Sequence, residues 1–165
     1  MISHYYSLSD AYSLEYWSYL FGPTLQDGKH AFLVYLNFDH EGGDCALVTA
    51  GSYDAKLRET FSYLAALKCP VFVRIGGEMN VWGNAAAPED YKAAYIHIAN
   101  LARAISPNAA LVFSPNFSAA TGVDMDSFYP GDSYVDWVGT SLYYNRYANN
   151  GDTRWQMQQR QLTVL

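Results

Sequence analysis

Short, nearly continuous apolar runs alternate along the chain with longer segments that are apolar on one side. The clearest runs cover residues 30–38, 70–75, 110–114 and 135–144, and residues 2–6 form a shorter candidate. Each run has the length of a strand and is rich in Val, Phe or Tyr, which is typical of strands buried on both faces of a parallel sheet. The pattern therefore predicts five strands.

The segments between these runs predict three helices. In residues 88–106 the apolar side chains recur with the spacing of a buried helix face, and Pro88 suits the first turn. Residues 54–68 repeat the pattern, with Asp54 as a candidate N-cap, and residues 9–21 form a third, weaker helix. This alternation predicts right-handed crossovers and a parallel sheet, either a (β/α) barrel or an open doubly wound sheet.

Composition indicates a globular chain without a membrane or nucleic-acid surface. Of its 165 residues, 50% are hydrophobic and 16% are charged, and the net charge is −6 with no cluster of Lys or Arg. No apolar run approaches the roughly 20 residues of a membrane span, and no signal peptide is visible at the start of the chain. We find no linker or repeat, so we expect residues 1–165 to form a single domain.

Cysteine usage and acidic clusters give little support for a metal site. Cys45 and Cys69 do not form a CxxC pair, so a zinc site is not expected; two buried free thiols are favoured over a single disulfide. The acidic segment 39–44 has metal-ligand residue types without a recognised spacing, and we interpret it as a solvated loop.

Polar and aromatic groups collect where the predicted strands end, which is where α/β folds place their active sites. Directly after residues 70–75 come two glycines, Glu78, Asn80 and Trp82. A carboxylic acid in an apolar, aromatic-walled cleft suits proton transfer, and a Trp can stack on a sugar ring. Asn80 and Asn116 can each donate and accept hydrogen bonds, as sugar hydroxyls require.

Each of these residues also has a purely structural explanation. Glu78 could cap the next helix or form an ion pair with Arg74, and Trp82 could belong to the core. Asn116 follows Pro115, which is typical of an Asx turn. Both interpretations stay open at this point.

Two sequence blocks resemble those of a known enzyme family. The stretch VFVRIGGEMNVW at 71–82 resembles the R-x-x-x-E-M-N-x-W signature of glycoside hydrolase family 26, typified by β-mannanases. The stretch FYPGDSYVDWVG at 128–139 is similar to the YPGD-x-YVD-x-VG segment that leads into the family's sixth strand. Between them, ALVFSPN at 110–116 resembles its fifth strand.

The resemblance implies an eight-stranded (β/α) barrel and a retaining mechanism. Glu78 would be the acid/base at the end of the fourth strand. A sixth-strand aromatic, Tyr143 or in the alternative register Tyr144, would help to position the nucleophile. The rest of the implied site consists of Arg74, Asn80 and Trp82. The expected substrate is a β-linked polysaccharide, β-mannan first and mixed-linkage β-glucan or xylan next, without a cofactor. By the same resemblance we expect the full-length protein to be extracellular or at the cell surface.

The chain departs from the family pattern in two places. Gly77 stands where mannanases usually have His before the Glu, which removes a hydrogen-bonding partner. The family's nucleophile is a second Glu after the seventh strand, whereas beyond Tyr144 this chain offers only Asp152. The chain is also shorter than the about 250 residues of a complete barrel.

We therefore expect an incomplete barrel, about strands two to six, that is inactive by itself and can self-associate through its open edges. The alternative from another functional class is a non-catalytic carbohydrate-binding barrel that lacks the nucleophile.

Overall fold

A computed structural model describes residues 1–9, 14–38, 44–81, 87–118, 120–142 and 156. Its strands form one parallel sheet in which spatial order follows chain order. The strands are β1 (Ile2–Ser7), β2 (Phe32–Asn37), β3 (Val71–Ile75), β4 (Ala109–Phe113) and β5 (Trp137–Val138). A doubly wound sheet reverses its strand order at a switch point, and this sheet does not. The partial (β/α) barrel is confirmed, and the open doubly wound alternative is wrong.

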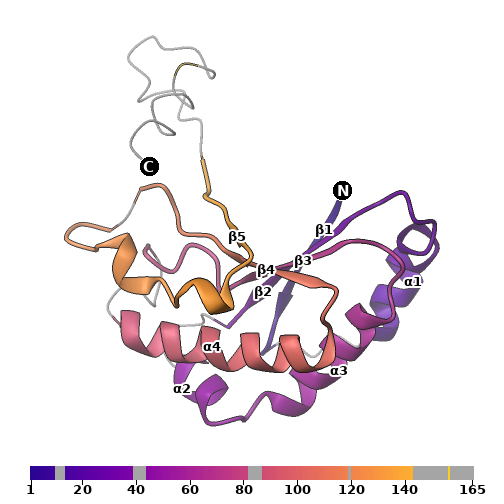
Figure 1. The fold of residues 1–165 in the computed structure, drawn as a ribbon, viewed down its shortest axis with the longest axis horizontal. Helices are drawn as coiled ribbons and strands as arrows, with labels where there is room; N and C mark the ends of the chain where they lie inside the picture. Colours follow the sequence, from indigo (N-terminus) through magenta and orange to yellow (C-terminus); the bar gives the residue numbers. More distant parts are fainter. Residues whose placement is uncertain (10–13, 39–43, 82–86, 119, 143–155, 157–165) are drawn as a thin grey trace.

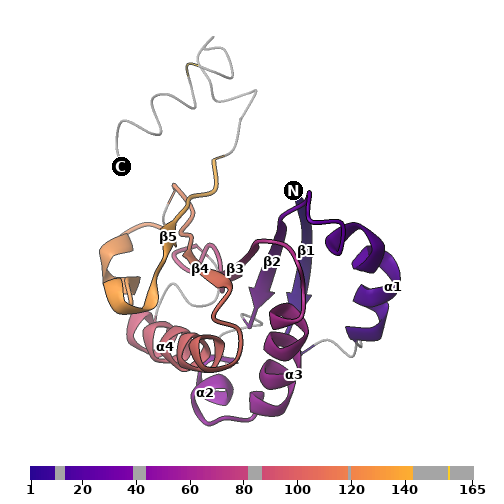
Figure 2. The same cartoon turned by 45° about the vertical axis from the view of Figure 1, so that its right-hand side comes forward.

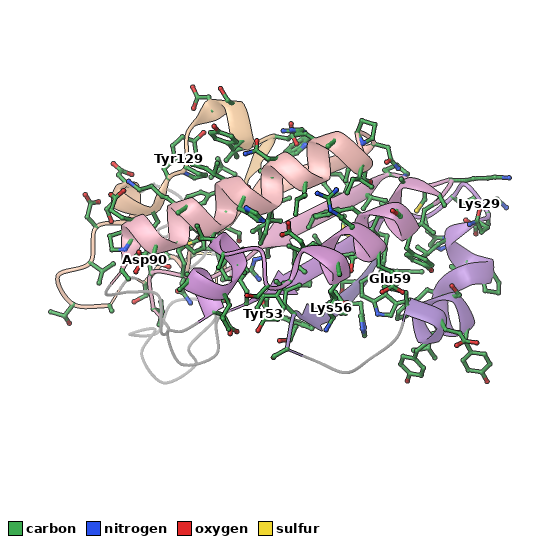
Figure 3. The ribbon with its side chains drawn as sticks, turned by 90° about the horizontal axis from the view of Figure 1, so that it is seen from below. Lys29, Tyr53, Lys56, Glu59, Asp90 and Tyr129 are labelled. Atoms are coloured by element: carbon green, nitrogen blue, oxygen red, sulfur yellow. The ribbon has the colours of Figure 1, made fainter. Side chains whose placement is uncertain are left out.

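Helices connect the strands and lie along the outer side of the curved sheet (Figures 1 and 2). They are α1 (Leu14–Leu25), α2 (Asp44–Thr49), α3 (Asp54–Ala65) and α4 (Pro88–Ile105). Figure 3 shows this helical face, with Tyr53 and Lys56 at the start of α3 and Asp90 at the start of α4. Two short 3-10 helices, η2 (Met125–Phe128) and η3 (Asp132–Tyr134), lie between β4 and β5.

The core lies between the sheet and these helices. Alternate strand residues are buried toward the helices: Phe32, Val34 and Leu36 of β2 are fully inaccessible. Trp17 of α1 packs edge-on against Phe32 with ring centroids 5.7 Å apart. Because side chains alternate across a strand, one face of each strand fills this core and the other faces inward.

The inward face is more open than the apolar runs predict. Tyr5 of β1 is 64% exposed and Trp137 of β5 is 60% exposed. The expectation that the strands are buried on both faces is therefore wrong for this side. The five strands curve, but within the described part of the chain no further strand lies opposite them.

Several element boundaries differ from the sequence prediction. In the described part of the run 135–144, residues 135–142, β5 contributes two residues of ladder, and an isolated parallel bridge between Asn116 and Ser141 follows. The six-residue helix α2 is too short to show a periodic pattern and was not predicted. Asp54 does not cap α3: Tyr53 occupies the N-cap position without a side-chain bond, and Asp54 lies 2.6 Å from His97 Nε2 on α4.

Cys45 and Cys69 are both buried free thiols, as favoured from the sequence. Among the helices of the described residues, none is long and apolar enough to cross a membrane.

Candidate functional site

A tight turn at the carboxyl end of β3 presents Glu78. The turn begins at Gly76, whose φ of 51° lies in the left-handed region that glycine adopts without strain. A Cβ at this position would lie 2.7 Å from Phe38 Cζ and 2.9 Å from Tyr91 Cε2, so only glycine fits. The Tyr91 hydroxyl donates to the Ile75 carbonyl at 2.9 Å and fixes the end of the strand.

Glu78 itself has an unusual backbone conformation. Its φ is 64°, and it is the one non-glycine residue with positive φ in the described part of the chain. Such a conformation costs about 1–3 kcal/mol and persists where the surrounding structure enforces it, often at functional sites. The Glu78 N–H donates to the Ser114 carbonyl at 2.8 Å, which ties this turn to the end of β4.

Arg74 approaches the Glu78 carboxylate from the inner face of β3. Its Nη2 lies 3.5 Å from Glu78 Oε1, and the two side chains are only 11% and 12% exposed. The same Nη2 donates to Ser141 Oγ at 2.9 Å. The guanidinium also lies 5.0 Å from the centre of the Tyr35 ring, within cation–π distance. The ion pair suggested by the sequence is thus present.

Asn116 approaches the same carboxylate from the end of β4. Its Nδ2 donates to Glu78 Oε2 at 3.1 Å. Asn80 is completely buried behind it, and both ends of the Asn80 carboxamide bond the Asn116 main chain, as donor to the carbonyl at 2.7 Å and as acceptor from the N–H at 2.8 Å. Asn80 therefore fixes the loop from which Asn116 reaches Glu78.

The result is a carboxylate oriented by donors from two neighbouring strands. Each oxygen of Glu78 has a described partner, Arg74 for Oε1 and Asn116 for Oε2. Both partners are polar groups. A carboxylate fixed in this way at the carboxyl ends of parallel strands is suited to exchanging a proton with a bound molecule.

A hollow of about 390 Å³ lies on the inner face beside this cluster. Its lining includes Arg74 and Ser141 at the strand ends and the aromatic rings of Tyr5 and Tyr35. The two rings stack with centroids 4.3 Å apart. This volume is within the range of small-molecule sites.

Sequence reasoning did not identify Ser141 or Tyr35 as partners of Arg74. The parallel register pairs Tyr35 directly with Arg74, so a register assignment could have found the contact. Ser141 lies in the irregular continuation of β5, where no periodic pattern points to it.

Several predicted residues lie outside the described part of the chain. They are Trp82, Tyr143, Tyr144 and Asp152. Most of the acidic segment 39–44 also lies outside it, but its last residue, Asp44, is buried at the start of α2. Among the described residues, no group of three or more His, Cys, Asp or Glu could hold a metal ion.

A second carboxylate lies at the opposite, amino end of the sheet. Asp136, just before β5, accepts from Arg103 Nη2 at 2.8 Å and from the Leu111 N–H at 2.7 Å. Partial burial alone would raise the pKa of Asp136, but these two hydrogen bonds outweigh it and the pKa falls below its ordinary value of 3.8. Asp136 joins β5 to β4 and α4.

Two comparisons with known proteins match this chain, one to a protein family and one to a solved structure. The family described as Glycosyl hydrolase family 26 matches residues 34–162, a range that contains both sequence blocks. The solved structure of GH26C from Muricauda sp. MAR_2010_75 is similar over 98% of this chain, with a TM-score of 0.75 and 15% sequence identity. The chain covers 55% of that protein's length, and at this identity the likeness concerns the fold. No curated protein matches the chain.

Proposed function

Because the chain belongs to glycosyl hydrolase family 26, we propose that it carries the acid/base part of a retaining glycoside hydrolase site, with Glu78 as the acid/base. The observation that carries this proposal is the Glu78 carboxylate itself. It is held by Arg74 and Asn116 from two strands, in a strained turn at the carboxyl end of the sheet.

In this mechanism Glu78 protonates the departing glycosidic oxygen and later takes a proton from the attacking water. A retaining enzyme needs a second carboxylate about 5–5.5 Å away as the nucleophile. In the described segments that directly follow the five strands, residues 8–9, 38, 76–81, 114–118 and 139–142, Glu78 is the acidic residue. The nucleophile therefore comes from outside these segments, and Asp152 is the candidate that the sequence offers after Tyr144.

The other site residues have distinct proposed roles. Arg74 and Asn116 orient the Glu78 carboxylate, and Asn80 acts through the Asn116 main chain. Trp82 is proposed as a stacking platform for a sugar ring. The remaining proposed substrate-binding residues, Tyr143 and Tyr144, follow β5.

The proposed substrate is a β-linked polysaccharide, with β-mannan ahead of mixed-linkage β-glucan and xylan. No cofactor enters the mechanism. Residues 1–165 are proposed as one partial catalytic barrel domain, and the full-length protein is proposed to act outside the cell or at its surface, where polysaccharides occur.

The test compares reducing-sugar release from these three polysaccharides by the chain, Glu78→Gln and Asp152→Asn. We expect the chain to bind mannooligosaccharide with negligible turnover, because protonation alone contributes only about 10²–10⁴-fold. Any hydrolysis present is lost in Glu78→Gln. Hydrolysis that survives Glu78→Gln contradicts the assignment of Glu78, and hydrolysis lost in both variants makes Asp152 the nucleophile.

The alternative is a carbohydrate-binding barrel without chemistry, which the single acidic residue at the described strand ends favours. A longer form of the protein that also carries a strand ending in Glu distinguishes the two. Turnover by that form supports the enzyme, and oligosaccharide binding without turnover supports the binding module.

Self-association through the open edge is also proposed. Trp137 and Val138 of the edge strand β5 are 60% and 67% exposed, and exposed apolar edges favour pairing with another chain. Sedimentation velocity should show a concentration-dependent dimer or larger species that weakens in Trp137→Lys. A monomer with a cooperative melt at ordinary mesophilic temperature contradicts this.

A further inference from the structure

The two glycines before Glu78 are required for different reasons. Gly76 needs its positive φ, and a side chain there would collide with buried aromatic rings. The φ of Gly77 lies outside the left-handed region, so a positive φ is not what requires glycine at this position. A Cβ at Gly77 would nevertheless lie 2.3 Å from Arg74 Nε, 2.5 Å from Cζ and 2.7 Å from Nη2. The three atoms nearest to that Cβ thus all belong to the Arg74 guanidinium, which stands in the way of a side chain at position 77.

The Arg74 guanidinium therefore occupies the space that the Cβ of any other residue at position 77 would need. From this place its Nη2 reaches Glu78 Oε1 and Ser141 Oγ. Its Nε is buried and has no hydrogen-bond partner among the described residues. Leaving a buried donor unpaired is unfavourable. The other contacts of Arg74 thus hold it against Gly77 despite this cost.

We propose that Gly77 is a positioning residue whose missing side chain admits the Arg74 guanidinium to the Glu78 carboxylate. The proposal rests on the proposed function of Glu78 and deepens it. A substituent at position 77 displaces Arg74 without altering the turn that holds Glu78.

The proposal predicts that Gly77→Ala folds but loses the ion pair. The nearest colliding atoms belong to the end of a flexible side chain, which can move aside. Gly139→Ala is a matched control at the same end of the sheet. Its Cβ would meet its nearest atom, Ser114 Oγ, at an ordinary 3.6 Å.

The experiment is a double-mutant cycle of Gly77→Ala and Arg74→Ala, read by carbon-13 NMR titration of the Glu78 carboxyl group. Arg74 is the charged partner of Glu78 among the described residues, and the Asn116 amide is neutral. Removing a nearby cation should move the titration midpoint up by about one pH unit in each single variant. The double variant should match Arg74→Ala alone, and Gly139→Ala should match the parent chain.

The proposal is overturned if folded Gly77→Ala titrates like the parent chain. It is equally overturned if the Gly77→Ala shift persists undiminished in the Arg74→Ala background. Should Gly77→Ala fail to fold, recovery of folding in the double variant supports the collision with Arg74, and continued failure refutes it.

Mannohexaose binding, measured on the same proteins, separates this proposal from the proposed function. If the parent chain and all variants fail to bind the sugar, the carbohydrate assignment fails. The NMR titration still decides the role of Gly77 in that case, because it requires no substrate.

Discussion

Two partly buried carboxylates lie near opposite ends of the sheet, Glu78 after the carboxyl end of β3 and Asp136 before the amino end of β5, and they are held in different ways. Asp136, at the amino end, is bonded through the main chain in both directions: its carboxylate accepts from the Leu111 N–H and its own N–H donates to the Leu111 carbonyl. Glu78, at the carboxyl end, has side-chain donors from Arg74 and Asn116 and a left-handed backbone. The main-chain bonds of Asp136 belong to the framework of the sheet. The side chains of Arg74 and Asn116, which hold Glu78, can rearrange more easily than main-chain groups.

This difference separates the two sequence blocks of the family. The block at 128–139 contributes Asp136 to the architecture, and the block at 71–82 contributes Glu78 to the candidate site. Barrel folds generally place stability at the amino ends of their strands and chemistry at the carboxyl ends. Substitutions at the two ends should therefore give different ratios of lost stability to lost sugar binding.

The largest effect is expected at Asn80. Asn80→Ala leaves the Asn116 N–H and carbonyl without partners inside the protein and should lower the free energy of unfolding by about 3 kcal/mol. Mannooligosaccharide binding should fall as well, because Asn116 loses its position. Urea denaturation measures the first effect and calorimetry the second.

Asn80→Leu is the matched control, since it keeps a side chain of similar volume at this buried position and removes both hydrogen bonds. It should lose nearly as much stability as Asn80→Ala, because the Asn116 N–H and carbonyl again lack partners. Parent-like stability in Asn80→Leu would mean that packing, rather than hydrogen bonding, makes Asn80 important.

At the opposite end, Asp136→Ala should lower the free energy of unfolding by about 2 kcal/mol, because the buried Leu111 N–H loses its acceptor. The contribution of Arg103 is smaller, since both partners of that pair are about one-third exposed. Sugar binding should change little when measured well below the denaturation midpoint. Loss of binding in a fully folded Asp136→Ala variant would abolish the contrast between the two ends.

The sequence predicted the architecture better than the details of the site. Strands and long helices follow from periodicity, because the face that each element buries recurs along the chain. Glu78 and its pairing with Arg74 were also within reach, since four residues along a strand and its turn bring both to one strand end. The contact with Ser141, 67 positions away, depends on how an irregular segment after β5 folds back, and local spacing carries no such information.

The backbone strain at Glu78 could not be predicted from the neighbouring residues in the sequence either. Nothing in a Gly-Gly-Glu sequence says that the third residue, rather than the second, adopts positive φ. In this conformation the Glu78 N–H donates to the carbonyl of Ser114, which directly follows β4. Glu78 thus adopts a positive φ, which a non-glycine residue locally disfavours, in a turn that a contact with a distant part of the chain holds in place.

A smaller difference in stability between two variants of Glu78 should reveal this backbone strain. Glu78→Gly should be more stable to urea than Glu78→Ala by about 1 kcal/mol, because glycine adopts positive φ without the steric cost of a Cβ. Both variants lack the carboxylate, so the comparison isolates the backbone. If Glu78→Ala proves as stable as Glu78→Gly, the turn carries no strain and its link to function is lost.

The smallest effect is the pH dependence that Asp136 gives to stability. Because folding lowers the pKa of Asp136 below 3.8, its contribution is complete above that value and is lost as the pH falls through the lower pKa of the folded state. The carboxylate is about one-third exposed, so the contribution should stay below about 1 kcal/mol. Urea denaturation between about pH 6 and pH 2.5 should show a steeper loss for the parent chain than for Asp136→Asn, which cannot titrate at this position. Identical pH profiles would show that the hydrogen bonds of Asp136 do not favour its charged form over its neutral form.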